Sequence, residues 1–256
     1  MALSAGAQYR AGEAWSMGLM FSGNSKHTIE QLQSGRKAIS AGELLMPGEI
    51  ILDEGQSHSS AEVAAIYSDR GIDGVTDRSY RWLRSRSNHP TNIRPRPLTL
   101  NVWEAVYFDH DLARLTELAK VAEEIGVERF VLDDGWFGSR RDDTKGLGDW
   151  VVSDEVWPEG LGPLVDVVKK HGMEFGLWFE GEMVNPDSDL YRAHPDWILS
   201  AGGRVPPTGR GQLVLDLTNP DCYQHVLSHV DAVLSAYDIS YIKWDHNRPL
   251  VEPGHG

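Results

Sequence analysis

The segment YIKWDHNRPL, residues 241–250, joins a strand-like start to a dense set of polar side chains. Side chains alternate along a strand, so Lys243 and Asp245 are expected on the same face. Either the two form a structural ion pair, or Lys243 keeps Asp245 ionised, because a nearby cation lowers the pKa of a carboxylate. An ionised carboxylate at the end of a strand can act as a nucleophile. The spacing alone leaves both interpretations open.

Two adjacent carboxylates, Asp133 and Asp134, end another apolar run in the segment VLDDGW. They either cap backbone amides of the following turn or accept hydrogen bonds from two neighbouring hydroxyl groups. Adjacent carboxylates can also bind a metal ion, but the chain has no DxDxDG loop and no HExxH motif, and its histidines are scattered. We therefore expect no metal ion and no other cofactor. A second acidic pair, Asp142 and Asp143, lies in a long polar loop, where we expect it to be solvated.

Further polar candidates accompany two other strand-like runs. In GLWFEGEM, Trp178 and Glu180 share a face, and Glu182 follows. Glu180 or Glu182 serves either as a general acid or as a supporting hydrogen-bonding group. Arg210 precedes the run QLVLDLT and is either a loop cation or a donor to a substrate or to the nucleophile.

Nine tryptophans are many for a chain of 256 residues, and several of them stand beside carboxylates, as in Trp103-Glu104 and Trp244-Asp245. A buried tryptophan is normally a core residue. Tryptophan next to carboxylates at strand ends also suits a sugar, because a pyranose offers an apolar C–H face and a rim of hydroxyl groups.

Composition excludes several classes of function. The formal net charge is −14, from 38 acidic and 24 basic residues, which argues against binding to nucleic acid or to anionic lipid. The single cysteine, Cys222, cannot form an internal disulfide. We see no signal peptide and no membrane-spanning segment. These features predict a soluble cytoplasmic protein with a neutral small-molecule substrate.

The elements that position these residues fall into three parts. Residues 1–75 contain short apolar runs cut by turns, which predicts antiparallel β-structure. Residues 76–96 are helical and then Pro-rich, and we expect a linker there. Residues 97–256 alternate between strand-like and helix-like runs, which indicates βα units and a parallel sheet. The five predicted strands of this part lie near residues 97–105, 128–136, 173–183, 211–218 and 240–247.

Two α/β architectures compete for residues 97–256. A doubly wound nucleotide-binding fold needs a glycine-rich turn after its first strand, but VYFDHD follows NVWEA and contains no glycine. Several predicted strands end in polar residues instead, as in (β/α)₈ barrels, where the site is built from many strand ends. We favour an incomplete (β/α)₈ TIM barrel with about five of its eight βα units.

These residues carry a resemblance to a known family. The sequence resembles glycoside hydrolase family 36, the bacterial-type α-galactosidases, from about Ala41 to Arg248. Motifs of this length are highly specific. The matching stretches follow the family's order: NVWEAVYFDH, RFVLDDGWFGSRRDDTKGLGDWVVSDEVWPEGL, GMEFGLWFEGEMVNPDSDLYRAHPDW, QLVLDLTNP and YIKWDHNR.

The resemblance implies roles for the acidic residues. Asp245, in KWDHN, matches the catalytic nucleophile. Asp133 and Asp134 match the pair that grips the galactose hydroxyls at C4 and C6. Glu180 and Glu182 then take supporting roles.

The resemblance also implies the rest of a sugar-binding site. Trp103 and Trp178 match the aromatic walls around the sugar. Arg210 and Lys243 match basic residues that contact the substrate and the nucleophile, and Asn247 is a further polar contact. Inside the matched region, Gly181 stands where the family suggests proline, and we expect it to loosen that loop.

The implied activity is hydrolysis of terminal α-galactosides such as melibiose and raffinose, with retention of configuration and without a metal. Retention needs two carboxylates about 5–5.5 Å apart. The family's acid/base carboxylate lies in a later segment, after a Cys- and Gly-rich motif that this chain lacks. We therefore expect a partial chain, with the end of a β-sandwich domain at residues 1–75, that is inactive on its own.

Other functions remain open. The chain could be a non-catalytic galactoside-binding fragment, or part of a transglycosylase or an α-N-acetylgalactosaminidase; a metal-dependent barrel enzyme is disfavoured. The expected partner is a galactoside substrate, and we expect the full-length parent to be a homo-oligomer. An open barrel leaves an unpaired strand edge, so we expect the chain alone to self-associate.

Overall fold

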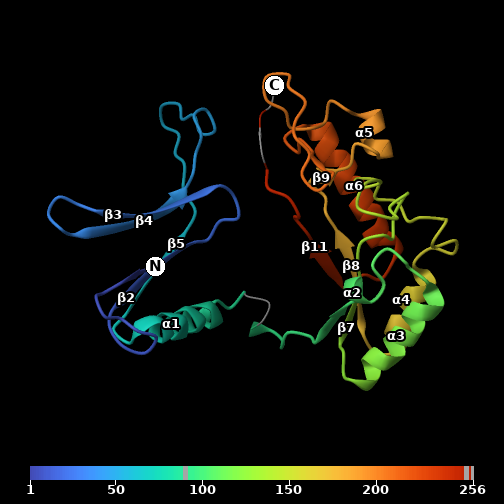
Figure 1. Ribbon diagram of the computed structural model, residues 1–256, viewed down its shortest axis with the longest axis horizontal. Coiled ribbons are helices and arrows are strands. Elements are labelled where there is room, and N and C mark those ends of the chain that lie inside the picture. Colours follow the sequence, from blue (N-terminus) through green and yellow to red (C-terminus); the bar gives the residue numbers. More distant parts are fainter. Residues whose placement is uncertain (89–91, 251–253, 255–256) are drawn as a thin grey trace. The chain divides into compact units, whose positions relative to one another are not determined.

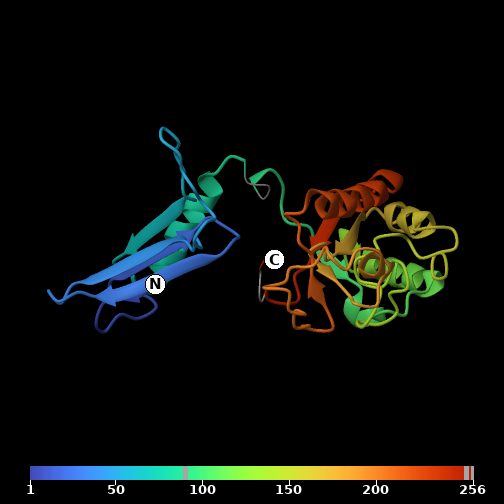
Figure 2. The same ribbon diagram turned by 90° about the horizontal axis from the view of Figure 1, so that it is seen from above.

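The chain folds as two compact units, Met1–Arg96 and Pro97–Gly256 (Figures 1 and 2). The computed structural model describes residues 1–88, 92–250 and 254. None of the helices within these residues is long and apolar enough to cross a bilayer.

The first unit is built mainly from short antiparallel strands, as the sequence predicts. β1 (Ala2–Leu3), β2 (Ala14–Leu19) and β5 (Val63–Ser68) form a sheet in the order β1-β2-β5. β3 (Ser25–Gln31) and β4 (Lys37–Glu43) form a separate hairpin.

The helix α1 (Gly71–Ser85) also belongs to the first unit, because it packs against β2 and β5. A Cβ atom at Gly71 would lie 2.1 Å from the carbonyl oxygen of Gln8, and one at Gly74 would lie 2.0 Å from Oγ of Ser68. The two glycines thus let the start of α1 lie close to Gln8 and Ser68. The basic residues of this helix gave no indication of that packing. The sequence assigns residues 76–96 to a linker, whereas the structure places their helical part on the sheet and ends the first unit at Arg96.

The second unit contains a parallel sheet with the strand order β11-β8-β7-β6. Its strands are β6 (Thr99–Asn101), β7 (Arg129–Leu132), β8 (Glu174–Phe179) and β11 (Tyr241–Trp244). β7 is buried throughout and β8 is buried after its first residue, which is typical of central strands in a parallel sheet. The mixed α/β class with a parallel sheet is therefore confirmed.

Helices connect the strands. They are α2 (Trp103–Val106), α3 (Leu112–Glu124), α4 (Gly162–Lys170), α5 (Asp189–Ala193) and α6 (Pro220–Ala236). α3 packs on α4, and α4 packs on β8 (Figure 1). The start of α6 follows from its sequence: Asn219 accepts hydrogen bonds from the first free N–H groups, and Pro220 occupies the first turn.

The predicted strand at 211–218 was wrong in both extent and partner. The run at 211–218 yields only β10 (Leu213–Val214), which pairs antiparallel with β9 (Met183–Val184) outside the main sheet. β11 pairs directly with β8, so the described residues give four parallel strands and not five. The apolar residues of β10 are buried in this small ribbon, which explains why they resemble a barrel strand.

The first predicted strand is also shorter than expected. β6 ends at Asn101, and the backbone turns into the helix α2 at Trp103. Because of this turn, the Trp103 indole lies at the carboxyl end of the sheet and lines the hollow described below.

Candidate functional site

A polar hollow of about 280 Å³ lies beyond the carboxyl ends of the parallel strands. Its lining includes all eight residues to which the resemblance assigns a catalytic or binding role: Trp103, Asp133, Asp134, Trp178, Arg210, Lys243, Asp245 and Asn247. Phe108 and Asp143 also line it. Larger hollows exist, including one of about 660 Å³ in the first unit, but its lining contains no carboxylate. Chemistry and not size therefore selects the site.

The strand register brings the residues together. β11 runs parallel to β8 with Lys243 opposite Trp178 and Trp244 opposite Phe179. The backbone N–H of Asp245 then donates to the carbonyl oxygen of Phe179 at 2.8 Å. Because carboxyl ends of parallel strands meet at one edge, this pairing sets Asp245 beside the end of β8.

Asp245 is half-buried and held by several donors. The indole Nε1–H of Trp178 donates to its Oδ2 at 3.0 Å, and the backbone N–H of His246 donates to its Oδ1 at 3.0 Å. Burial acts to raise the pKa of Asp245, but these bonds, a hydrogen bond from Asn247 and the charge of Lys243 outweigh it and lower the pKa below its usual value. Asp245 is therefore ionised at neutral pH.

Lys243 pairs directly with Asp133 and only indirectly supports Asp245. Its Nζ donates to Oδ2 of Asp133 at 2.6 Å, and the Asp133 side chain is 4% exposed. Asn101, which the sequence gave no reason to choose, also donates to Oδ2 of Asp133. Lys243 therefore does form an ion pair, but its partner is Asp133 at the end of β7, two strands away in the order β11-β8-β7.

Asp134 is clamped by Arg140, a buried arginine that sequence reasoning missed. Nε of Arg140 donates to Oδ1 of Asp134 at 3.0 Å, and Nη2 donates to Oδ2 at 2.8 Å. Arg140 also donates to the side-chain oxygen of Asn185 at 2.9 Å. Burial raises the pKa of Asp134, and the Arg140 pairing opposes this rise. The only signal in the sequence was a pair of arginines in a loop predicted to be polar.

Aromatic rings and an arginine complete the walls. Trp103 packs edge-on against Phe108, with ring centroids 5.0 Å apart. Arg210 lies in a two-residue turn in which Gly209 and Gln212 exchange backbone hydrogen bonds. Arg210 and Gly211 have φ values of 54° and 72°, as in a type I′ turn. Such a backbone is costly for arginine and is often retained at functional sites.

Asp143 has a position that the sequence did not predict. It is exposed, as predicted for the polar loop, but it also lines the hollow. The other three carboxylates of the described lining, Asp133, Asp134 and Asp245, directly follow parallel strands. Asp143 lies in a loop, and no ion pair is found for it among the described residues.

Glu180 and Glu182 do not line the hollow. Glu182 accepts a hydrogen bond from the indole Nε1–H of Trp244 at 2.9 Å. A Cβ atom at Gly181 would lie 2.6 Å from that same indole ring. Gly181 thus gives the Trp244 ring room, and a proline here would require the ring to move.

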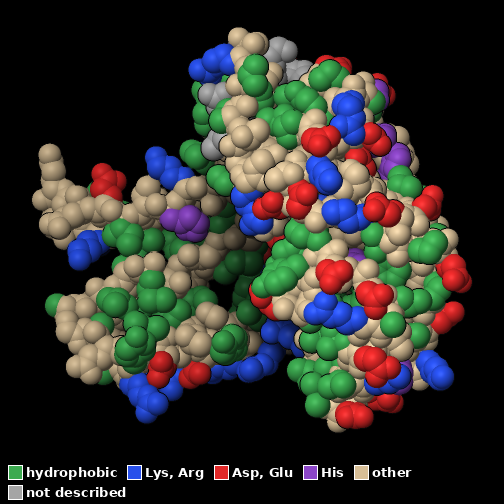
Figure 3. All heavy atoms as spheres, turned by 45° about the vertical axis from the view of Figure 1, so that its right-hand side comes forward, with side chains coloured by type: hydrophobic (Ala, Val, Ile, Leu, Met, Phe, Trp, Pro, Cys, Tyr) green, Lys and Arg blue, Asp and Glu red, His purple; other side chains and the backbone are tan. Residues whose placement is uncertain are grey.

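Within the described residues, no group of three or more His, Cys, Asp or Glu side chains is arranged to hold a metal ion. Lys and Arg are interspersed with Asp and Glu on the face of the larger unit seen in Figure 3.

Comparisons with known proteins point to one family. The Melibiase family model matches residues 57–256. An α-galactosidase of Escherichia coli is 42% identical over 244 residues, and α-galactosidase AgaA of Geobacillus stearothermophilus is 40% identical over the same length. The crystal structure of the GH36 α-galactosidase AgaA superposes with a TM-score of 0.90 at 39% identity and covers 98% of this chain.

The chain belongs to the Melibiase family, within the group of GH36 proteins. The alignment covers 95% of this chain but only 34% of the E. coli and Geobacillus relatives. The chain therefore spans about a third of the length of the relatives that it matches.

Proposed function

We propose that this chain carries the nucleophile and the galactose-binding residues of a retaining α-galactosidase. The observation that carries the proposal is the convergence of Asp245 with Asp133 and Asp134 in one hollow. The lowered pKa of Asp245 supports its role as the attacking group. In the first step its carboxylate bonds to the anomeric carbon and the aglycone leaves, and in the second step water releases galactose.

The other residues hold the sugar. Asp133 and Asp134 accept hydrogen bonds from the hydroxyl groups at C4 and C6, and Trp103 and Trp178 flank the apolar face of the ring. A carboxylate forms short, strong hydrogen bonds with hydroxyl donors.

Three nitrogen-bearing side chains complete the binding site. Lys243 and Arg210 donate to substrate oxygens, and Asn247 donates to the nucleophile and the hydroxyl group beside it. All three line the hollow that contains Asp245.

The substrates we propose are α-galactosides of the melibiose and raffinose type. A variant of the related AgaA was crystallised with raffinose and another with stachyose. Transglycosylation and α-N-acetylgalactosaminidase activity are alternatives on the same scaffold. We also keep the expectation of a cytoplasmic, homo-oligomeric parent protein.

The acid/base carboxylate is proposed to lie outside these 256 residues, so the chain alone should bind galactose without turnover. Asp133 and Asp134 are each paired with a cation. Apart from Asp245, Asp143 is the carboxylate among the described lining residues for which no ion pair is found. If the chain alone hydrolyses p-nitrophenyl α-galactoside, Asp143→Asn should be tested first. Loss of that activity would place the acid in this chain and overturn this part of the proposal.

The matching experiment for the nucleophile uses the full-length protein that carries this chain. Asp245→Ala should lower kcat by more than about 1,000-fold, because removal of a nucleophile leaves only binding and charge stabilisation. Near-normal turnover in this variant would refute the assignment. Calorimetry of the chain with galactose distinguishes a binding fragment from an inert one.

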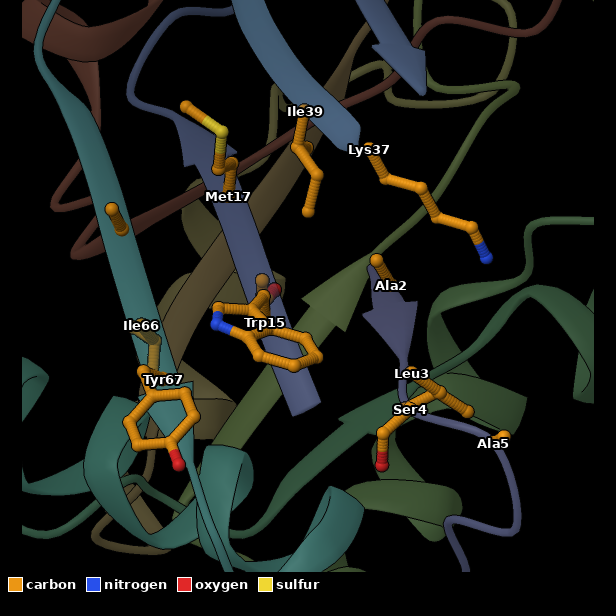
Figure 4. A pocket seen from close by; sticks show the side chains of 12 residues that line it. Ala2, Leu3, Ser4, Ala5, Trp15, Met17, Lys37, Ile39, Ile66 and Tyr67 are labelled. Carbon is orange, nitrogen blue, oxygen red and sulfur yellow. The ribbon is translucent and has the colours of Figure 1, made fainter. Parts of the chain in front are cut away.

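We further propose that the first unit is the end of a β-sandwich and that the second unit begins a (β/α)₈ barrel. Figure 4 shows Trp15 in the middle of the apolar hollow of the first unit, with Met17, Ile39 and Tyr67 around it. An apolar sheet face of this kind is normally covered by a second sheet. Dye binding to exposed apolar surface should therefore be strong and should fall in Met17→Glu; no binding by the parent chain would contradict the proposal.

A further inference from the structure

Glu180 is a buried carboxylate that lies behind the hollow. It directly follows β8, none of its surface is exposed, and it is not part of the lining. Acidic side chains are almost never fully buried without polar partners. Here Oε1 accepts from the backbone N–H of Asn247 at 2.6 Å, and Oε2 accepts from Nε2 of Gln212 at 3.2 Å.

Asn247 links Glu180 to Asp245. Its backbone N–H is the group that donates to Oε1 of Glu180 at 2.6 Å. Its side chain acts to lower the pKa of both Glu180 and Asp245, as a polar group that faces a carboxylate does. The bond from the Asn247 backbone to Glu180 therefore fixes the position from which the Asn247 side chain faces Asp245.

The neighbouring strand end fixes the other side of Asp245. Trp178 and Glu180 lie two residues apart and share a face of the chain. Trp178 donates directly to Oδ2 of Asp245 at 3.0 Å, whereas Glu180 acts through Asn247. The carboxylate of Asp245 is thus held between a donor on β8 and a donor that Glu180 anchors.

We infer that Glu180 is a positioning residue for the nucleophile: it holds the backbone of Asn247, keeps the Asn247 side chain beside Asp245, and so fixes the orientation of the attacking oxygen. The inference rests on the proposed function, because it requires Asp245 to be the nucleophile. A misplacement of a reacting group by about 1 Å can cost roughly 100-fold in rate. Glu180 does not touch the sugar, so its effect should fall on the chemical step and not on binding.

Glutamine at position 180 separates positioning from folding. It has the shape of glutamate without the charge that strengthens the hydrogen bond from the Asn247 backbone N–H. Burial raises the pKa of Glu180, and the nearby charge of Asp245 adds to this rise. A neutral residue here therefore carries no cost of burying an ionised group, and Glu180→Gln should not lower Tm at neutral pH.

The test compares Glu180→Gln with Glu182→Gln in the full-length protein, using p-nitrophenyl α-galactoside. We expect kcat of Glu180→Gln to fall by roughly 10- to 100-fold. Its KM and its dissociation constant for 1-deoxygalactonojirimycin should stay within about threefold. Glu182→Gln is the matched control, because Glu182 is the same residue type two positions on and bonds the Trp244 indole. Its kcat should stay within about threefold.

A double-mutant cycle with Asn247→Ala tests the route of the effect. If Glu180 acts through Asn247, the double variant should have the kcat of Asn247→Ala within about threefold. If the losses in kcat of the two single variants multiply in the double variant, the inference is overturned. An unchanged kcat in Glu180→Gln would also overturn it, as would a loss of affinity for 1-deoxygalactonojirimycin as large as the loss in kcat. A full-length parent protein that does not hydrolyse the galactoside would contradict the proposed function and the inference together. An active parent protein whose Glu180→Gln variant keeps the same kcat would contradict the inference alone.

Discussion

The two acidic regions of the hollow hold their negative charge in different ways. At the end of β7, Asp133 and Asp134 are 3% and 6% exposed, and each is paired with a cation. At the end of β11, Asp245 is more exposed, and its direct partners are the neutral N–H groups of Trp178, His246 and Asn247. A carboxylate that is paired with a cation is fixed in place, whereas one held by neutral donors keeps its charge available for attack. The environment therefore divides the acids into binding groups and a nucleophile.

Breaking a buried pair at the end of β7 should give the largest change in stability. Asp134→Asn leaves Arg140, which is 2% exposed, without its charged partner. We expect the free energy of unfolding to fall by roughly 3–5 kcal/mol, since an uncompensated buried charge is costly. Urea denaturation measures the change. Asp142→Asn, in the same loop, is the control and should change stability by less than about 0.5 kcal/mol; equal effects would show that the pair is not structural.

Removing the cation of Asp133 should have an intermediate effect, on binding. Lys243→Met takes away the 2.6 Å bond to Asp133 and leaves the Asn101 contact in place. A hydrogen bond to a charged group is worth roughly 1.5–3 kcal/mol, so affinity for 1-deoxygalactonojirimycin should fall by roughly 10- to 100-fold. Calorimetry checks this, with Lys170→Met on the exposed end of α4 as the control. Unchanged affinity would mean that Lys243 serves only the fold.

The smallest expected effect concerns the neutral donors of Asp245. Trp178→Phe removes the indole N–H, so the pKa of Asp245 should rise towards its usual value, and the acidic limb of kcat/KM should move to higher pH. The sign for stability agrees: a lowered carboxylate pKa stabilises the fold above the unfolded-state pKa, and this contribution is lost as pH falls through the folded-state pKa. Trp178→Phe should therefore lose stability at pH above about 4.

Trp157→Phe is the matched control for that prediction. The Trp157 indole N–H is buried without a hydrogen-bond partner among the described residues, so its loss should leave the acidic limb in place. A shift of the same size in both variants would show that the limb reports general loosening of the core and not the bond to Asp245.

The sequence predicted the residues of the hollow better than the elements that carry them. Strand ends are marked by polar residues after apolar runs, which is how Asp133, Asp134 and Asp245 were found. The run around Leu213 misled, because burial in a two-stranded ribbon leaves the same apolar signature as burial in a sheet. Local pattern alone cannot distinguish these partners.

The supporting residues could not be predicted for a related reason. Arg140 and Asn101 stand in polar or mixed stretches, and their importance arises from a long-range contact to Asp134 or Asp133. Spacing along the chain does not encode such contacts. The same holds for Glu180: its spacing left a general acid and a supporting group open, and only the family resemblance favoured the supporting role.

Covalent trapping would identify the nucleophile by its chemistry, independently of any substitution. The full-length protein would be treated with a fluorinated galactosyl donor that forms the glycosyl-enzyme quickly and releases it slowly, and the labelled peptide would be identified by mass spectrometry. We predict a single galactosyl label on Asp245. A label on Asp133, Asp134 or Asp143, or rapid turnover of α-galactosides with no label on any carboxylate, would contradict the account.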